Sequence, residues 1–179
     1  SDYPARPGYR KSFLGTGALE VPLPKIKKEA SILYWKTGPA KKSELKYWNY
    51  SVVMNKDRKL AFYSAVNVDA NLRPTSGGRE GDRWYYDTRI ADKKLQLGPE
   101  FYAEQREFEM DRTYNPFDRG HLTRRLDAQW GHDEDEIKRN GDDSFHWTNC
   151  SPQHWQFNQG KKKWLGLEDY VIKGFASRT

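Results

Sequence analysis

The sequence predicts an α+β fold with a mostly antiparallel sheet. Its strand-like segments are rich in aromatic and β-branched residues, and a short turn joins the first two of them. No regular alternation of strands and helices follows, and a parallel sheet would need crossover helices between its strands. At 179 residues the chain has the length of one domain. We therefore expect residues 1–179 to form a single domain.

The composition indicates a folded, soluble protein. Hydrophobic residues make up only 36% and mean hydropathy is −1.05, but 15% of residues are aromatic, a content that disordered chains lack. No apolar run approaches the roughly 20 residues that cross a bilayer, so a membrane is not an expected partner. Residues 1–11 lack the apolar core of a signal peptide. The single Cys150 excludes an internal disulfide framework and leans towards a reducing, cytoplasmic compartment.

The charge balance favours an anionic partner. Lys and Arg number 31 against 25 Asp and Glu, a net charge of +6. The run from Asp133 to Glu136 is acidic, however, so the charge is not the uniform basic stripe of a simple nucleic-acid-binding module. A solvated surface of mixed charge explains the overall balance about as well.

In the first half of the chain the pattern predicts an arm and a hairpin. Residues 1–30 are interrupted by Pro and Gly too often for a helix and are expected to form an extended wrapping arm. Residues 47–54 and 60–68 are predicted strands, and the polar residues 55–59 between them are expected to turn. Residues 99–109 open at a Pro and predict a short helix.

The second half predicts two short strands and two helices. Residues 118–122 form the first strand, and 134–140 form a helix. Residues 144–149 alternate apolar and polar side chains, the period of a half-buried strand. Pro152 is expected to end that strand and open a helix, and apolar residues at helical spacing over 164–175 predict the last helix.

Two clusters carry side chains suited to cutting a phosphodiester: Asp118-Arg119-Gly120-His121 and Phe157-Asn158-Gln159. The reaction needs a base for the attacking water, and a His has a pKa near neutrality. It also needs charge stabilisation on the phosphate and leaving oxygens, which Mg²⁺ supplies. Because Mg²⁺ retains several waters, one Asn amide oxygen suffices as its protein ligand. An Arg beside the His can pair with phosphate oxygens.

The first of these clusters, Asp118-Arg119-Gly120-His121, resembles the DRGH signature of the DNA/RNA non-specific endonucleases, the ββα-metal nucleases that include endonuclease G. The similarity continues through Thr148–Gln153, Phe157–Gln159, and Trp164 with Leu167-Glu168. By looser pattern it extends upstream to residues 15–24, the hairpin and 83–87, so that it covers nearly the whole chain.

The resemblance implies a ββα-metal core over residues 117–175, with a His at a strand end and a metal-ligand Asn on the following helix. It implies a Mg²⁺-dependent endonuclease that hydrolyses DNA and RNA without sequence specificity and leaves 5′-phosphate and 3′-hydroxyl ends. One Asn and waters would also accept Mn²⁺.

The resemblance also implies roles for individual residues. His121 matches the general base, Asn158 the direct metal ligand, and Arg119 the arginine that binds phosphate. Glu168 matches a glutamate in the water shell of the metal, and Arg83 an arginine on the leaving-group side.

Other polar residues near the motif have less specific expectations. Asp118 is expected to brace the strand end rather than react. Arg124 and Arg125 are expected either to hold the nucleic-acid backbone or to be a solvated pair. Asn149 and Gln153 are assigned to structural hydrogen bonds at the strand exit.

Two features depart from the family pattern. The ten residues from Asn158 to Glu168 (168 − 158 = 10) are two more than usual, and on one ideal helix they would leave the side chains about 80° apart. Glu168 can reach the metal shell only if the helix starts irregularly near Gly160. Family members also continue with further strands, so the chain is expected to be a compact version or part of a longer polypeptide.

Several alternatives stay open at this stage. The residues fit a non-catalytic module that binds nucleic acid or a partner on a nuclease scaffold. They also fit a toxin or defence effector controlled by another domain or an inhibitor protein. His146, Cys150 and His154 recur every four residues as zinc ligands would, but Pro152 breaks the helix that this spacing needs.

Overall fold

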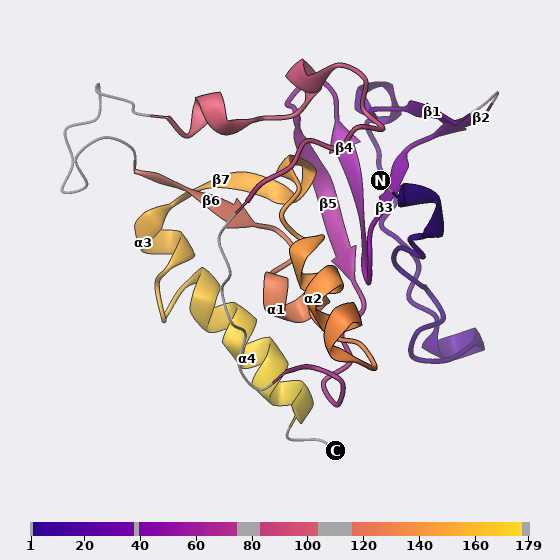
Figure 1. The fold of residues 1–179 in the computed structure, drawn as a ribbon, viewed down its shortest axis with the longest axis vertical. Helices are drawn as coiled ribbons and strands as arrows, with labels where there is room; N and C mark the ends of the chain where they lie inside the picture. Colours follow the sequence, from indigo (N-terminus) through magenta and orange to yellow (C-terminus); the bar gives the residue numbers. More distant parts are fainter. Residues whose placement is uncertain (1, 38–39, 75–82, 104–115, 177–179) are drawn as a thin grey trace.

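The computed structural model describes residues 2–37, 40–74, 83–103 and 116–176. It has mixed α and β structure with antiparallel sheets, as the sequence predicts (Figure 1). Beside the α-helices and strands, short 3₁₀ helices occur at Tyr3–Ala5, Gly17–Leu19, Glu29–Ser31, Lys93–Leu95, Pro99–Phe101 and Trp147–Asn149.

A three-stranded sheet forms the centre of the molecule. It consists of β3 (Glu44–Lys46), β4 (Tyr50–Asn55) and β5 (Leu60–Val66), in the order β3-β4-β5 and antiparallel throughout. A separate hairpin pairs β1 (Trp35–Thr37) with β2 (Ala40–Lys42). Every residue of β4 is buried, and β4 is the central strand of this sheet.

The predicted hairpin is confirmed, with a later start. The Asn55 side chain accepts hydrogen bonds from the backbone N–H groups of Asp57 and Arg58, and Lys59 adopts a positive φ of 58°. These contacts close the turn between β4 and β5. β4 begins at Tyr50 rather than at Tyr47, because residues 47–50 form the preceding turn, with Asn49 at φ 66°.

A second sheet pairs β6 (Phe117–His121) with β7 (Cys150–His154) in antiparallel register. In Figure 1 these two strands extend to one side of β4 and β5, and α3 lies at their outer end. The chain passes directly from the last residue of β7 into α3.

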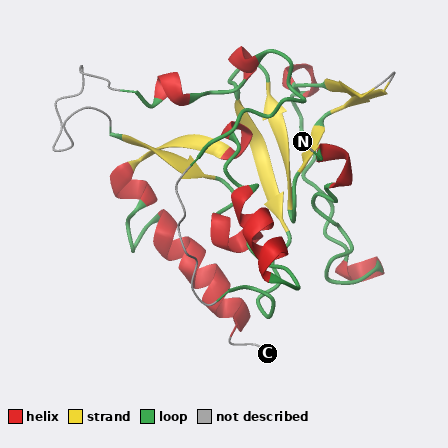
Figure 2. Cartoon of the chain, in the orientation of Figure 1, coloured by secondary structure: helices red, strands yellow, loops and turns green. Residues whose placement is uncertain are grey.

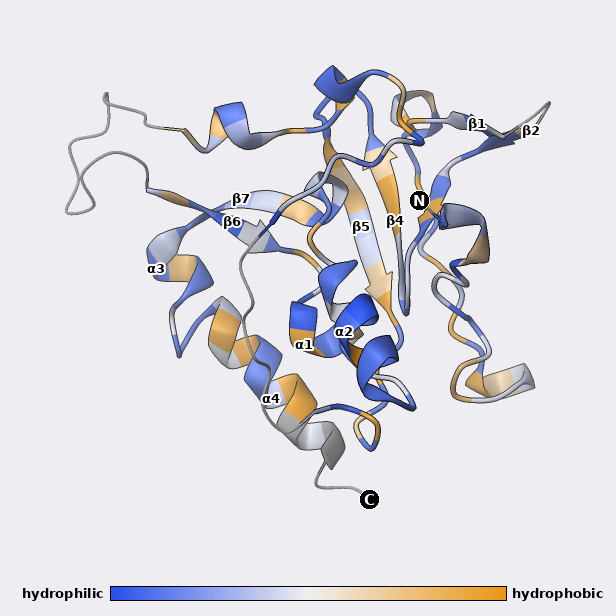
Figure 3. Ribbon diagram, in the orientation of Figure 1, coloured by the Kyte–Doolittle hydropathy of each residue, from blue (hydrophilic) through white to orange (hydrophobic). Residues whose placement is uncertain are grey.

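The described residues also form the α-helices α1 (Arg125–Ala128), α2 (Glu134–Asp142), α3 (Trp155–Asn158) and α4 (Trp164–Ala176). Figure 2 shows α4 as the longest of them. Asp133 caps α2 by accepting a hydrogen bond from the Glu136 N–H, the expected function of an Asp at this position. Figure 3 shows α2 as hydrophilic along most of its length, in keeping with its place at the surface.

The strand predicted for residues 144–149 is wrong. All six residues are buried, so the alternation of side chains does not mark one wet and one dry face, and Trp147–Asn149 form a 3₁₀ turn. Pro152 does not end a strand either, since it lies in the middle of β7 opposite Arg119. A residue without an N–H is tolerated there because β7 is an edge strand of a two-stranded sheet.

The predicted helix over 99–109 is only partly within the described residues. Pro99–Phe101 form a 3₁₀ turn there, and residues 104–109 lie outside the described part of the chain.

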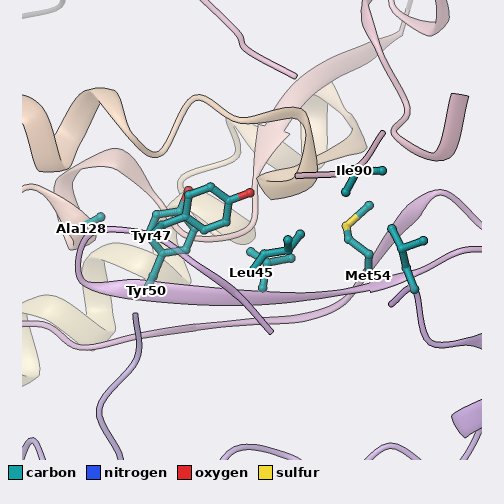
Figure 4. Close-up of a cluster of buried hydrophobic side chains, with 8 residues drawn as sticks. Leu45, Tyr47, Tyr50, Met54, Ile90 and Ala128 are labelled. Carbon is teal, nitrogen blue, oxygen red and sulfur yellow. The ribbon is translucent and has the colours of Figure 1, made fainter. Parts of the chain in front are cut away.

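The core lies over one face of the central sheet and is rich in tyrosine (Figure 4). The rings of Tyr47 and Tyr50 stack at 4.6 Å, and both side chains are fully buried. Their hydroxyls are satisfied: Tyr47 hydrogen-bonds Asp87 and Thr148, and Tyr50 donates to the Asp143 carbonyl. Buried hydroxyls with partners avoid the cost of desolvation, so polar side chains can occupy the interior.

The N-terminal residues pack on the central sheet through backbone contacts. The Gly8 N–H donates to the Tyr47 carbonyl, and the Tyr9 N–H donates to the Ser51 hydroxyl. Gly8 has φ 73°, and a Cβ there would lie 2.6 Å from Ser51 Oγ. A glycine is needed at this position for both reasons.

Candidate active site

β6 carries two of the predicted site residues, Arg119 and His121, in the second sheet. Its pairing with β7 depends on Gly120, because a Cβ at that position would lie 2.3 Å from the Gln153 side chain. The Gln153 amide passes beneath the strand and donates to the His121 carbonyl at 3.3 Å. The glycine of the motif is therefore a packing requirement, and Gln153 has the structural role that the sequence predicts.

Asn149 fastens the strand end to the rest of the molecule. Its carboxamide is fully buried, accepts from the Thr123 N–H and donates to the carbonyls of Thr123 and Ser144. The Leu122 N–H also donates to the Asn149 carbonyl. The prediction of structural hydrogen bonds for Asn149 is confirmed, and these bonds hold the chain immediately after His121.

The His121 ring lies between aromatic side chains and a serine. Its centroid is 4.6 Å from that of Trp84 and 4.8 Å from that of Phe145. Nε2 lies 3.4 Å from the Ser144 hydroxyl, which itself donates to the Gly141 carbonyl at 2.7 Å. Because the serine proton is directed at Gly141, the serine oxygen is the acceptor for His121. This arrangement favours the Nε2–H tautomer of His121.

Asp118 joins β6 to the end of α3. Its carboxylate accepts from the side-chain amides of Asn158, at 2.9 Å, and Gln159, at 2.7 Å. Since the Asn158 Nδ2 points at Asp118, its Oδ1 is turned the other way and is the atom suited to a cation. The sequence suggests only a brace for the strand end, and the contact with two residues of the later motif is an addition from the structure.

A pocket of about 560 Å³ brings the two motifs together. Asp118, Arg119, His121, Asn158 and Gln159 all line it. Arg119 is exposed at its edge, and within the described residues it forms no ion pair. Five side chains that sequence analysis groups only by motif therefore face one space, which we call the His121 pocket.

The aromatic wall of the His121 pocket is missed by sequence reasoning. Trp84, Tyr102 and Trp147 line it, with Trp147 stacked on Trp84 at 5.3 Å and on Tyr102 at 5.6 Å. Their residue types alone indicate hydrophobic core, and only their position beside His121 shows that they shape the pocket.

Glu168 on α4 has Arg124, Asp127 and Asp169 as charged neighbours and is not among the residues that line the pocket as described. Burial raises its pKa to about 7; Arg124 opposes this rise, while Asp127 and Asp169 add to it. The helix is broken as the longer spacing requires, since α3 ends at Asn158 and α4 begins at Trp164.

The other predicted arginines lie apart from the pocket lining as described. Arg124 is 13% exposed and pairs with Asp127 at 3.1 Å and Asp169 at 2.8 Å, so its charge serves the fold. Arg125 lies on α1. Arg83 is exposed, and its guanidinium lies 5.4 Å from the centre of the Tyr85 ring.

The residue set fits a hard divalent cation more closely than zinc. The available atom is an amide oxygen of Asn158, the ligand type that Mg²⁺ accepts. The zinc alternative fails because its three side chains have separate partners: His146 with Tyr3 and the Asp143 carbonyl, Cys150 with Tyr102, and His154 with the Gln156 N–H. Among the residues that the structure describes, no three His, Cys, Asp or Glu side chains form a metal cluster.

Comparison with known proteins gives two matches. The profile of the DNA/RNA non-specific endonucleases matches residues 31–178. A protein of Sinorhizobium fredii (strain NBRC 101917 / NGR234), described as uncharacterized protein y4fB, is 44% identical over 180 residues. The match covers 95% of this chain, and the chain spans only 25% of that relative. Within its described residues the structure has no helix long and apolar enough to cross a membrane.

Proposed function

This chain belongs to the DNA/RNA non-specific endonuclease family, and from that premise we propose that it is a Mg²⁺-dependent endonuclease that cuts DNA and RNA without sequence specificity. The family membership indicates a nuclease that acts on nucleic acid. The metal, the mechanism and the residue roles below are the proposal.

One observation supports the proposal most strongly: His121, Arg119 and Asn158 line the same pocket although they come from β6 and α3. A base, a cation for phosphate and an oxygen ligand for a metal are the three groups that phosphodiester hydrolysis needs. A purely structural histidine would not require an exposed arginine and an oriented amide beside it.

In this proposal His121 takes a proton from the attacking water. The bond from Nε2 to Ser144 holds the ring, and the proton goes to Nδ1 as water attacks phosphorus. Arg119 binds the phosphate oxygens from the edge of the pocket, where it is exposed to substrate. Contact with phosphate and not with base edges would give cleavage without sequence specificity.

Asn158 would hold the cation through Oδ1, and Asp118 would hold Asn158 in that orientation. Bound Mg²⁺, or Mn²⁺ in its place, supplies charge stabilisation to the phosphate and leaving oxygens. Glu168 and Arg83 enter the proposal only as outer residues, since neither is part of the described pocket lining.

The test is nicking of a supercoiled plasmid with and without EDTA. The parental protein should nick it in Mg²⁺ and stop when EDTA is added. His121→Ala should lower the rate by about 10²- to 10⁴-fold, the usual contribution of a general base. The matched control is His132→Ala, an exposed histidine outside the pocket.

Binding of a labelled duplex and the thermal unfolding of His121→Ala should resemble those of the parent. A His121→Ala protein that nicks plasmid at the parental rate would show that the base is assigned wrongly.

A further inference from the structure

A paired segment of the chain lies beside the His121 pocket and beside a second pocket. The Tyr85 N–H donates to the Phe145 carbonyl at 2.8 Å, and the Trp147 N–H donates to the Tyr85 carbonyl at 2.9 Å. Trp84 and Trp147 line the His121 pocket, while the neighbouring Tyr85 lines the second one. Because Trp84 and Tyr85 are adjacent in the chain, with Cα atoms about 3.8 Å apart, both pockets border this paired segment.

The second pocket, which we call the Tyr85 pocket, has a volume of about 530 Å³, and its lining combines the aromatic side chains of Tyr3, Trp48, Tyr85 and Tyr86 with seven charged ones. Tyr85 is 44% exposed, with the Arg83 guanidinium over its ring at 5.4 Å. Trp48 forms another wall, with the Arg139 guanidinium 4.1 Å from its ring. Aromatic rings beside arginines are the surfaces on which unpaired bases stack.

The charges of the Tyr85 pocket are largely paired with one another. Arg6 contacts Asp143 at 2.9 Å and Asp2 at 3.6 Å, and Lys138 contacts Asp142 at 2.9 Å. The lining carries three cations, on Arg6, Lys138 and Arg139, against four carboxylates, on Asp2, Asp135, Asp142 and Asp143. It therefore offers no net attraction to a phosphate, whereas the rings attract a flat, uncharged group. The pocket therefore suits a base, and the phosphate contacts remain with Arg119 in the His121 pocket.

We propose that the Tyr85 pocket receives an unpaired base of the polynucleotide whose phosphodiester lies in the His121 pocket, so that single-stranded nucleic acid is the preferred substrate. This inference rests on the proposed nuclease function. Bases of a duplex are paired and stacked on one another, and they reach an aromatic pocket only after they are turned out of the helix. A single strand presents its bases without that cost.

The experiment measures binding in the His121→Ala background, where cleavage does not interfere. The probes are a labelled short oligothymidylate and an oligomer of the same length made of abasic sugars. Tyr85→Ala should weaken binding of oligothymidylate by roughly tenfold to a hundredfold, the loss of one stacked base. It should not change binding of the abasic oligomer, which has no base to stack.

Two further variants separate stacking from a change of fold. Tyr85→Phe keeps the ring and should bind oligothymidylate as the parent does. Tyr170→Ala removes a tyrosine that is 76% exposed on α4, outside both pockets, and should leave binding of both oligomers unchanged. In the cleaving protein, Tyr85→Ala should lower the ratio of single-strand to duplex cleavage, and Tyr85→Phe should preserve it.

Equal weakening of both oligomers by Tyr85→Ala, or weakening of neither, would overturn the inference. Failure of the proposed function has a different signature: the parental protein would cut no nucleic acid in Mg²⁺. The contrast between oligothymidylate and abasic oligomer would still decide whether the Tyr85 pocket takes a base.

Discussion

A single carboxylate controls how the proposed metal ligand is presented. Asp118 accepts from the amides of both Asn158 and Gln159, and these contacts span 40 and 41 positions of the chain. An amide side chain has two similar ends, and without such a partner either end could face the pocket. The charged acceptor takes the nitrogen of Asn158, which leaves its oxygen as the end that would hold the proposed cation.

Asp118→Ala should therefore raise the Mg²⁺ concentration needed for half-maximal nicking by about 10- to 100-fold, the usual effect of removing a partner of a metal ligand. Nicking should recover in part at high Mg²⁺, because His121 is untouched. The measurement is a Mg²⁺ titration of the nicking rate. Asp57→Ala, in the exposed turn after β4, is the matched control and should titrate like the parent. An unchanged Mg²⁺ requirement in Asp118→Ala would show that the contact does not orient the ligand.

A second prediction at the scale of one residue concerns Glu168 and the dependence of stability on pH. Burial raises its pKa to about 7, above the roughly 4.3 of an unfolded glutamate. The folded state then binds the proton more tightly, so its contribution to stability is complete below about pH 4 and is lost as the pH rises through 7. Glu168→Gln stays neutral and avoids that loss. Its melting temperature should exceed that of the parent by more at pH 8 than at pH 4, as thermal unfolding at the two pH values would show. A difference between the two proteins that does not depend on pH would contradict the shifted pKa.

At the scale of elements, the sequence pattern predicts an element correctly when contacts between residues close in sequence determine its structure. The turn at 55–59 is closed by the side chain of Asn55, which accepts from N–H groups two and three residues along the chain. The polar residue types of the turn are therefore enough to predict it. The segment 144–149 is different, because its residues are buried by parts of the chain distant in sequence. Alternating apolar and polar residues indicate a strand only when one face of it is exposed to solvent. Since residues 144–149 are all buried, their alternation does not indicate a strand.

Close approach of β6 and β7 leads to a prediction for Gly120. A methyl group at this position would lie 2.3 Å from the Gln153 side chain, so Gly120→Ala should separate the strands or displace that side chain. We expect a loss of about 1–3 kcal/mol in the free energy of unfolding, the usual cost of overpacking. Urea unfolding measures it. The control is Gly174→Ala on α4, where no atom of the described residues lies within 4 Å of the added methyl.

Addition of Gln153→Ala to Gly120→Ala should restore part of the lost stability, because the space beneath the strand is then open. Equal stability of Gly120→Ala and the parent would show that the two strands can move apart at no cost.

At the scale of the whole molecule, the candidate site depends on contacts between distant segments. The motif residues His121, Arg119 and Asn158 can be found in the sequence because their order matches a family signature. The wall made by Trp84 and Trp147 cannot, since seven tryptophans are indistinguishable by type until the fold places Trp84 beside His121 and stacks Trp147 on Trp84. Arg124 shows another limit: its position next to the motif leaves substrate contact and solvent exposure equally open, and only the structure shows its ion pairs with Asp127 and Asp169.

The net charge of +6 and the exposed Arg119 lead to a prediction about binding in salt. Binding of a duplex to the His121→Ala protein should weaken linearly on a plot of log affinity against log salt, with a slope of about −0.9 for each phosphate neutralised. Arg119→Ala in that background should lower the affinity and reduce the slope by about one such unit, to the same extent for duplexes of different sequence. Lys11→Ala, which removes an exposed charge already paired with Glu20, should leave the slope unchanged. An Arg119→Ala slope equal to that of the parent would mean that this side chain contacts no phosphate, and a loss confined to one duplex sequence would mean that it contacts a base.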